Sequence, residues 1–286
     1  MLKTLMLCTA FAAATLLPSA LPAQRSGAVA PEAPLPAAPR GRPRAVDPDF
    51  YFVRLMYTDL RGRTMGRPAP FTCPELGGGD FFPRQGRGWA TDYPGADCKF
   101  MHGVDRLTGV RVHPDPHVRA ILDDDLFDFP YAYIVEPGGM YLSDAEATRL
   151  ADYLLRGGFL HIDDFWGLAE KANVEEQLRK VFPDRSLDVL PLSHPVFSAF
   201  FQIQEVIQVP NRSNGCYGGR TWESFDDTEP RIYGIEDDDG RLMVLVTYNS
   251  DLGDAWEYLD LPCYPAEIAV RALQMGVNFM VYAMTH

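Results

Sequence analysis

The sequence has few basic residues and few cysteines, and both shortages limit what the protein can do. Its 286 residues include 26 Lys and Arg against 39 Asp and Glu, which gives a formal net charge of −13. Nucleic acids and anionic membranes are bound by clustered Lys and Arg, so neither is an expected partner. The chain has 5 cysteines, and no CxxC or Cys/His spacing predicts a zinc site.

The sequence also lacks the motifs of several common enzyme classes. It has no GxxxxGK[ST] and no GxGxxG between a predicted strand and a helix, so its glycine-rich segment does not predict a phosphate loop. The nucleophile elbow GxSxG is absent as well. His161 and His194 have no Ser or Cys partner at a recognisable spacing, and His161 is expected in the core. Two prolines make the segment His113–His117 a rigid turn.

The N-terminal residues have the layout of a secretory signal peptide. Met1–Lys3 is followed by an apolar run, Thr4–Leu17, and then by small residues up to Ala23. A run of about 14 residues is shorter than the ~20 that span a membrane, so we expect a signal peptide at 1–23 and no membrane span after its removal. Residues 24–48 form a Pro/Ala-rich linker, and 49–286 a single α/β domain. This organisation predicts a periplasmic or secreted protein.

Four cysteines remain after the predicted cleavage: Cys73, Cys98, Cys216 and Cys263. An even number in an exported protein is typical of disulfides, so two are expected, with three possible pairings. A bond between Cys73 and Cys98 would staple a loop that is rich in Gly and Pro.

Helices and strands are predicted to alternate along the domain. Ser143 and Glu146 form a capping box at the start of a helix that ends at Gly157-Gly158, and the buried strand 159–163 follows. Alternation of this kind predicts a mostly parallel sheet in three layers, with helices on both faces. The other expected strands are 50–57, 110–112, 129–135, 187–190 and 242–248, the last in a hairpin that turns at Asp239-Gly240. The other expected helices lie around 100–107, 168–182 and 266–284, and a long irregular insertion follows the first strand.

Carboxylates follow three of the predicted strands. Glu136 comes after 129–135, Asp163 and Asp164 end 159–163, and Asp251 follows 242–248. In open α/β sheets ligands bind outside the carboxyl ends of the strands, so we expect these side chains to meet at one edge, beneath an aromatic loop. The predicted ligand-binding residues are Trp89, Asp92, Tyr93, Glu136, Asp163, Asp164, Trp166, His194, Asp251 and Trp256.

Two functions are compatible with such an edge. The first is a non-catalytic module that binds a small ligand or a protein, because tryptophan and tyrosine supply large rigid recognition surfaces. The second is a hydrolase whose carboxylates hold a divalent cation, Mg²⁺ or Ca²⁺, or act as acid and base. A purely structural interpretation is also open, in which Asp164 caps the next helix, Glu136 pairs with Arg54, and the tryptophans lie in the core.

Several strings occur in an order that resembles a known family. They are Gly88–Pro94, Phe159–Trp166 with its Asp-Asp-Phe-Trp, Val181–Asp184, His194–Phe197, Asp237–Val246 and Asn249–Trp256. From about Phe50 to His286 the chain is similar to the bacterial domain of unknown function 4159. The resemblance implies a flavodoxin-like fold, close to class I glutamine amidotransferases and ThuA-like proteins, but no established activity. Genes of the family often lie beside genes for MoxR-type AAA and von Willebrand A-domain proteins, and this resemblance implies an assembly role. A protein partner in the cell envelope is compatible with such a role.

One departure from the amidotransferases matters for function. Those enzymes need a nucleophilic cysteine on the turn after the third strand, with His and Glu as partners. Here that turn is Val135–Gly139 and contains no thiol, which excludes glutamine hydrolysis.

Overall fold

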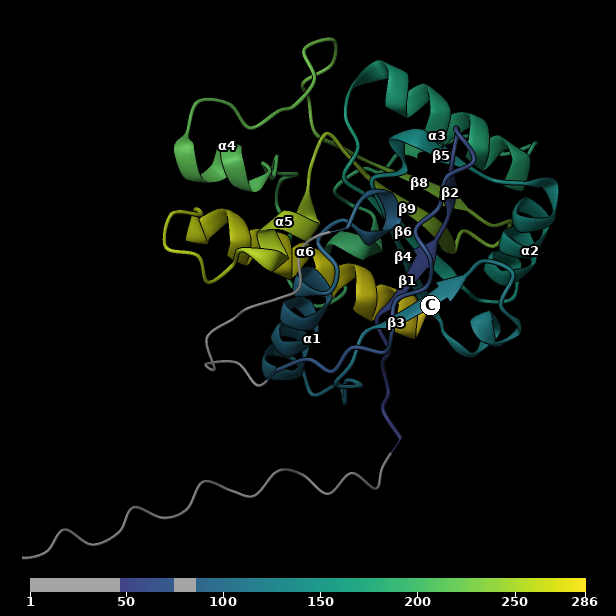
Figure 1. The fold of residues 1–286 in the computed structure, drawn as a ribbon, viewed down its shortest axis with the longest axis horizontal. Helices are drawn as coiled ribbons and strands as arrows, with labels where there is room; N and C mark the ends of the chain where they lie inside the picture. Colours follow the sequence, from purple (N-terminus) through teal and green to yellow (C-terminus); the bar gives the residue numbers. More distant parts are fainter. Residues whose placement is uncertain (1–46, 75–85) are drawn as a thin grey trace, which may run out of the picture. The chain divides into compact units, whose positions relative to one another are not determined.

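The structure, a computed structural model, describes residues 47–74 and 86–286 (Figure 1). The predicted signal peptide, most of the predicted linker and Gly77–Gly79 lie outside the described residues. The strands are β1 (Val53–Met56), β2 (Thr58–Asp59), β3 (His117–Ala120), β4 (Tyr131–Val135), β5 (Met140–Tyr141), β6 (Phe159–Asp163), β7 (Asp188–Val189), β8 (Arg231–Glu236) and β9 (Leu242–Tyr248). The α-helices are α1 (Gly95–Leu107), α2 (Asp144–Leu155), α3 (Gly167–Val181), α4 (Arg212–Tyr217), α5 (Leu252–Glu257) and α6 (Ala266–Thr285), and short 3₁₀ turns include η1 (Gly88–Ala90) and η3 (Pro137–Gly139).

The central sheet has seven strands in the order β3-β1-β4-β6-β9-β8-β7. Neighbours from β3 to β9 are parallel, whereas β8 and β7 are antiparallel to their neighbours. The predicted mostly parallel α/β sheet is therefore confirmed. Val135 at the end of β4 pairs with Asp163 at the end of β6, and Ile162 pairs with Val246 of β9. This register brings the carboxyl ends of three neighbouring strands to one edge.

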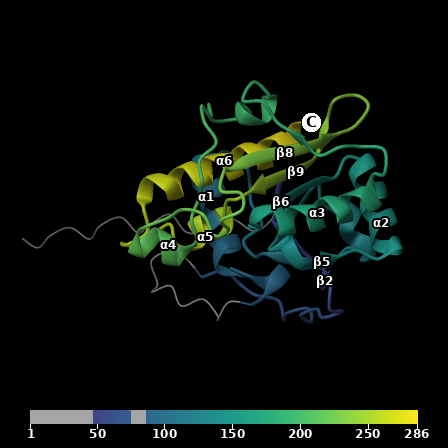
Figure 2. The same cartoon turned by 90° about the horizontal axis from the view of Figure 1, so that it is seen from above.

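Helices cover both faces of the sheet, as the three-layer prediction requires (Figure 2). On one face, Ile134, Leu160 and Ile162 pack in a single cluster with apolar residues of α2 and α3. On the other face, Tyr133 and Leu245 pack with residues of α1, α5 and α6. Because both faces are covered, the central strands are buried along their whole length and mostly apolar, and their few polar residues, among them His161 and Thr247, are buried as well.

The predicted local signals form as expected. Ser143 accepts a hydrogen bond from the backbone N–H of Glu146, and the Glu146 side chain accepts one from the backbone of Ser143, which completes the capping box of α2. Gly157 follows this helix at φ +111°, a conformation that residues with a Cβ rarely adopt. The hairpin between β8 and β9 turns at Gly240, φ +81°.

One predicted strand is wrong. Residues 110–112 contribute a single bridge, between Val112 and Phe50, and the strand beside β1 is β3, which begins at His117. β3 is at the edge of the sheet and pairs on one side alone, so it needs no apolar run of the kind that marks a buried strand. The turn before it brings the rings of His113 and His117 together, with His117 Nε2 at 3.3 Å from His113 Nδ1.

The four remaining cysteines form two disulfides, Cys73–Cys98 and Cys216–Cys263, as predicted. Such bonds persist in oxidising compartments and are rare in the cytosol. Within residues 47–74 and 86–286, no helix combines the length and the apolarity that crossing a membrane demands.

Candidate functional site

Three neighbouring parallel strands end in the same unusual way. The residue after β4 is Glu136 (φ +54°), after β6 it is Asp164 (φ +59°), and after β9 it is Asn249 (φ +54°). Asp92, in the loop after η1, has φ +62°. Non-glycine residues in this left-handed region are uncommon, and such strain is typically concentrated at functional sites. In the part of the chain that the structure describes, these four are the non-glycine residues with positive φ.

The carboxylates at this edge form two overlapping triads. Oxygens of Asp92, Asp251 and Asp254 lie within 4.8 Å of one another, and so do those of Asp164, Glu223 and Asp251. Four of these five residues are buried, and Glu223 is partly buried. Asp251 belongs to both triads and also caps α5, because its Oδ1 accepts the N–H of Asp254 at 2.7 Å. We call these five residues the carboxylate cluster.

Burial and mutual repulsion raise the pKa of the carboxyls in the cluster. The pKa of Asp251 lies well above its usual value, first because the group is desolvated and then because Asp164 and Asp254 are negatively charged. The pKa of Asp164 is raised by burial and then by Glu136 and Asp92. Asp92 is raised by burial and by Asp254. Buried like charges of this kind are stable only if protons or a cation neutralise them.

Glu136 lies close enough to the cluster for its charge to raise the pKa of Asp164. The residue is exposed, but protein surrounds its carboxyl group, and this desolvation, followed by the charges of Glu170 and Glu223, raises the pKa to about 7. Glu170 lies close by, where its Oε2 accepts the backbone N–H of Trp166 at 2.8 Å. A carboxyl with a pKa near neutrality can take up or release a proton under physiological conditions.

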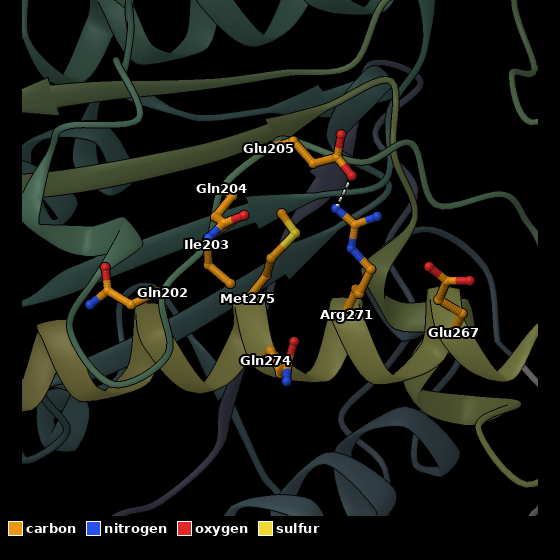
Figure 3. A pocket seen from close by; sticks show the side chains of 8 residues that line it. All are labelled: Gln202, Ile203, Gln204, Glu205, Glu267, Arg271, Gln274 and Met275. Carbon is orange, nitrogen blue, oxygen red and sulfur yellow. Dashed lines mark hydrogen bonds and ion pairs between the residues drawn. The ribbon is translucent and has the colours of Figure 1, made fainter.

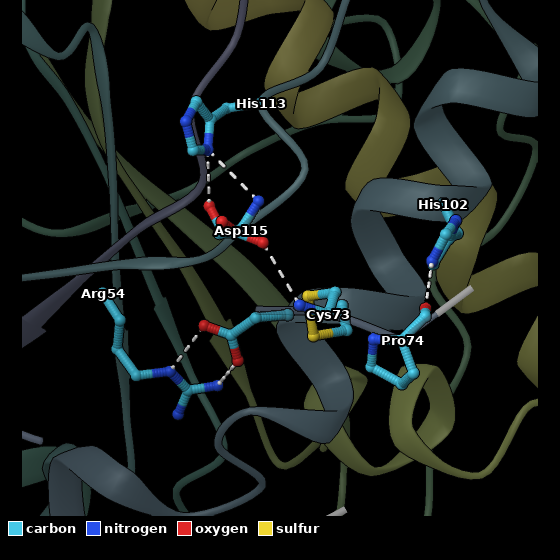
Figure 4. The surroundings of a disulfide bond; sticks show 8 residues. Arg54, Cys73, Pro74, His102, His113 and Asp115 are labelled. Atoms are coloured by element: carbon cyan, nitrogen blue, oxygen red, sulfur yellow. Dashed lines mark hydrogen bonds and ion pairs between the residues drawn. A yellow bond between two sulfur atoms is a disulfide. The ribbon is translucent and has the colours of Figure 1, made fainter. Parts of the chain in front are cut away.

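Arg54 positions the loop that carries Asp92. This buried side chain donates to both carboxylate oxygens of Asp97, at 3.1 and 2.5 Å (Figure 4). It also donates to the backbone carbonyls of Trp89 and Thr91. The disulfide from Cys98 anchors the same end of α1 to the preceding loop. Arg54 therefore pairs with Asp97, and the sequence-based pairing of Arg54 with Glu136 is not the one that forms.

A close approach explains the glycine at position 253. A Cβ built there would lie 2.6 Å from Oδ2 of Asp92 and 3.1 Å from the hydroxyl of Tyr133. Any larger residue would push Asp92 away from the first turn of α5. Gly253 thus permits the contact between the loop and the helix that brings the first triad together.

The structure brings five of the ten predicted residues, all of them acidic, to one edge of the sheet. Asp92, Glu136, Asp163, Asp164 and Asp251 all lie at the carboxyl edge. Asp164 does not cap α3; it accepts the indole N–H of Trp166 at 2.9 Å.

The aromatic residues predicted to bind a ligand are mostly buried. Trp256 is fully buried and its indole N–H donates to the carbonyl of Ala272, so it has no face for a ligand. Trp89 and Trp166 are 2% and 8% exposed, and Tyr93 is partly buried against the core. These four side chains are therefore largely part of the core.

His194 lies at the opposite edge of the sheet. Its Nε2 is 3.1 Å from Glu236, the last residue of β8, which runs antiparallel to β9. The structure thus separates His194 from the predicted site, because the antiparallel strand delivers its end to the amino edge.

Sequence reasoning missed two members of the cluster. Asp254 follows Asp251 by three residues at a helix start, a spacing typical of a capped first turn, so this signal was present. Glu223 lies in a turn-rich segment without a local signal, where Asn211 binds its side chain at 2.6 Å.

A separate cavity of about 550 Å³ lies over α6 (Figure 3). Gln204, Glu205, Arg271 and Met275 are among its lining residues, and an ion pair between Arg271 and Glu205 crosses it. No residue of the carboxylate cluster lines this cavity.

Comparison with known proteins identifies the family alone. No curated protein matches the chain. A family described as Domain of unknown function (DUF4159) matches residues 82–284, which is more than half of the sequence and includes every member of the carboxylate cluster. The chain therefore belongs to the DUF4159 family.

Proposed function

We propose that the protein is a non-catalytic binding module whose carboxylate cluster takes a divalent cation. The observation that carries this proposal is the pair of triads that share Asp251, with oxygens within 4.8 Å of one another. Mg²⁺ and Ca²⁺ prefer oxygen ligands, and carboxylates supply both the ligand atoms and the compensating charge.

Charge balance supports the same conclusion. Arg54, a buried cation whose charge acts on Asp92, already donates two hydrogen bonds to Asp97. Lys99 is committed in the same way, to the carbonyl of Glu257 and to Asp260. A divalent ion bound at Asp251 would replace the protons that otherwise neutralise the cluster, and would relieve the repulsion between its members.

The test is a cation-dependent gain in thermal stability. We expect Ca²⁺, Mg²⁺ or Mn²⁺ to raise the melting temperature of the purified protein, because a ligand bound by the folded state alone stabilises it by about 2.7 kcal/mol at 100 times its Kd. Asp251→Asn keeps the helix cap but removes the shared ligand charge, so the rise should disappear.

Asp237→Asn is the matched control, because Asp237 pairs with Arg241 at the amino edge. This variant should respond to cations like the wild type. A wild-type melting temperature that no divalent cation changes would contradict the proposal.

A second candidate is a hydrolase, and one observation favours it. Glu136 combines an exposed position with a pKa of about 7, which suits a general acid or base beside a bound cation. Release of nitrophenol from nitrophenyl phosphates, esters and glycosides in the presence of Mg²⁺ or Mn²⁺ would support it, provided that Glu136→Gln abolishes the release. Absence of turnover on all three classes would leave the binding function.

We further propose that the protein is exported to the periplasm or secreted. The two disulfides support an oxidising compartment, and the N-terminal residues match a signal peptide. Intact-mass measurement should give a mature chain that begins at Gln24 and has no thiol that alkylates without reduction. Four alkylated thiols in unreduced protein would contradict this proposal.

A further inference from the structure

Asp163 differs from the carboxylate cluster because hydrogen-bond donors saturate it. The side chain is fully buried, and Oδ2 accepts the hydroxyl of Tyr133 at 2.8 Å and the N–H of Gly253 at 3.1 Å. Oδ1 accepts the hydroxyl of Thr247, and the N–H of Leu252 donates as well. A carboxylate offers about four lone-pair sites, so these four donors leave none for a metal ion.

A chain of buried side chains continues from Thr247 into the core. Nε2 of His161 lies 3.3 Å from the Thr247 hydroxyl oxygen, and Nδ1 of His161 lies 2.9 Å from the hydroxyl of Tyr131. His161 is fully buried, and this burial lowers its pKa to about 3, so the imidazole is neutral. We call Tyr131, His161 and Thr247 the relay.

The direction of these hydrogen bonds follows from the carboxylate. Burial raises the pKa of Asp163 to about 6, so above that pH the ionised group can only accept, and the Thr247 hydroxyl donates to it in preference to the neutral carbonyl of Ile162 at 3.1 Å. The Thr247 oxygen must then accept from His161, which places the imidazole proton on Nε2. Nδ1 accepts from Tyr131 in turn. All three members therefore donate toward Asp163, an arrangement in which each bond strengthens the next.

Asp163 connects the relay to the carboxylate cluster through the first turn of α5. It holds the N–H groups of Leu252 and Gly253, which form the first turn of α5. Asp251 and Asp254 project from the same turn, against Asp92. A shift of this turn would separate the first triad even though all three of its carboxylates were still present.

We propose that Asp163 and the relay are positioning residues: they fix the first turn of α5 so that Asp251 and Asp254 converge, and Asp163 itself does not bind the cation. The part of this inference that concerns affinity rests on the proposed function. The part that concerns the turn does not, and it can be tested on the cation-free protein.

The first test is amide hydrogen exchange of the full domain without added cations. Thr247→Val keeps the shape of the side chain but removes the hydroxyl, so the Gly253 amide should exchange at least about tenfold faster, while amides of α2 stay unchanged. Thr247→Ser restores the hydroxyl and should return the rate to within about threefold of the wild type. An unchanged Gly253 rate in Thr247→Val would overturn the proposal.

A second measurement needs no variant and applies even if Thr247→Val does not fold. The ¹⁵N chemical shifts of His161 in the wild type should show a neutral ring that is protonated on Nε2 between pH 7 and 8, where Asp163 is ionised. A ring protonated on Nδ1 would reverse the direction of the relay and overturn it.

The affinity test then separates this proposal from the proposed function. Thr247→Val should weaken Ca²⁺ or Mn²⁺ binding by about tenfold or more, without the loss of a ligand, and Thr247→Ser should restore it. Equal affinity in the wild type and Thr247→Val would overturn the positioning role. If the wild type binds no cation but Gly253 exchange responds as expected, the proposed function fails and the role of the relay in fixing the turn stands.

Discussion

The two edges of the same sheet differ in how their carboxylates are paired and in which residue types have positive φ angles. At the amino edge, Gly157 and Gly240 supply the positive φ angles, and the carboxylates of Asp237 and Asp238 pair with arginines. At the carboxyl edge, β4, β6 and β9 are each followed directly by a non-glycine residue with positive φ, namely Glu136, Asp164 and Asn249, and the carboxylates of the cluster face one another.

This difference indicates that the carboxyl edge lowers the stability of the protein. A glycine at a turn and an arginine beside an aspartate cost little stability, and the chain uses both at the turns of the amino edge. A strained non-glycine residue costs of order 1–3 kcal/mol, and three neighbouring strands end on one. Sites of this kind persist where function requires them, because stability alone would remove them.

The largest expected effect comes from removing the fully buried cation–carboxylate pair at the carboxyl edge, Arg54 with Asp97. Arg54→Ala leaves the buried carboxylate of Asp97 without a partner and should destabilise the protein by about 3–5 kcal/mol. Arg241→Ala is the matched change at the amino edge, where the pair is partly solvated, and should cost no more than about 2 kcal/mol. Urea unfolding measures both, and similar losses for the two variants would erase the contrast between the edges.

The pH dependence of stability should also report on the carboxyl edge. The pKa of Glu136 is raised from 4.5 to about 7, and those of Asp92, Asp164 and Asp251 are raised well above 3.8. The folded state therefore holds protons more tightly than the unfolded state, so stability is full at low pH and is lost as pH rises through the folded pKa values. The lowered pKa of the buried His161 has the opposite effect, because it makes stability increase with pH. This effect is confined to pH values below about 6.5, where the unfolded residue titrates.

We therefore expect the melting temperature to fall by about 5 °C between pH 6.5 and 8.5 without divalent cations. Asp251→Asn should reduce this slope, because it removes one of the coupled carboxyls, and Asp237→Asn should not. Differential scanning calorimetry across the pH range checks both statements, and a melting temperature that rises over this interval would contradict the assigned pKa directions.

The smallest expected effect is that of replacing one aspartate by asparagine. The change in stability should have opposite signs at the two edges. Asp164→Asn suits the φ of +59° and keeps an oxygen for the indole of Trp166, but it removes a repelled charge, so it should stabilise the cation-free protein by about 1 kcal/mol at pH 8. Asp237→Asn loses an attractive pair with Arg241 and should destabilise by up to about 1 kcal/mol. Equal signs in urea unfolding at pH 8 would refute the comparison.

Most of the sheet could be predicted from local sequence because its central strands are buried on both faces. β4, β6 and β9 appear as apolar runs that stop at a carboxylate or an amide, and the parallel register then places Glu136, Asp163 and Asp251 at one edge. The edge strand β3 could not be found this way, because a strand paired on one side carries no such run.

The chemistry of the site was less accessible than its location. Side chains from other strands determine whether the oxygens of an aspartate are filled by hydrogen-bond donors or can bind a metal ion. Tyr133 of β4 and Thr247 of β9 decide this for Asp163. Glu223 reaches the cluster from a segment that the Cys216–Cys263 disulfide tethers to the loop before α6. Neither relationship leaves a periodic signal.

The strand order also determines when the repulsion arises during folding. Asp92 and Asp254 are 162 residues apart, and Leu160 of β6 pairs with Val244 of β9, 84 positions further along the chain. Contacts of such long range close late, so the cluster should be largely unformed in the transition state. The repulsion would then accelerate unfolding and leave the folding rate nearly unchanged. In stopped-flow measurements, Asp164→Asn should accordingly slow the unfolding arm and leave the refolding arm in place; a change confined to refolding would mean that the carboxylates meet early.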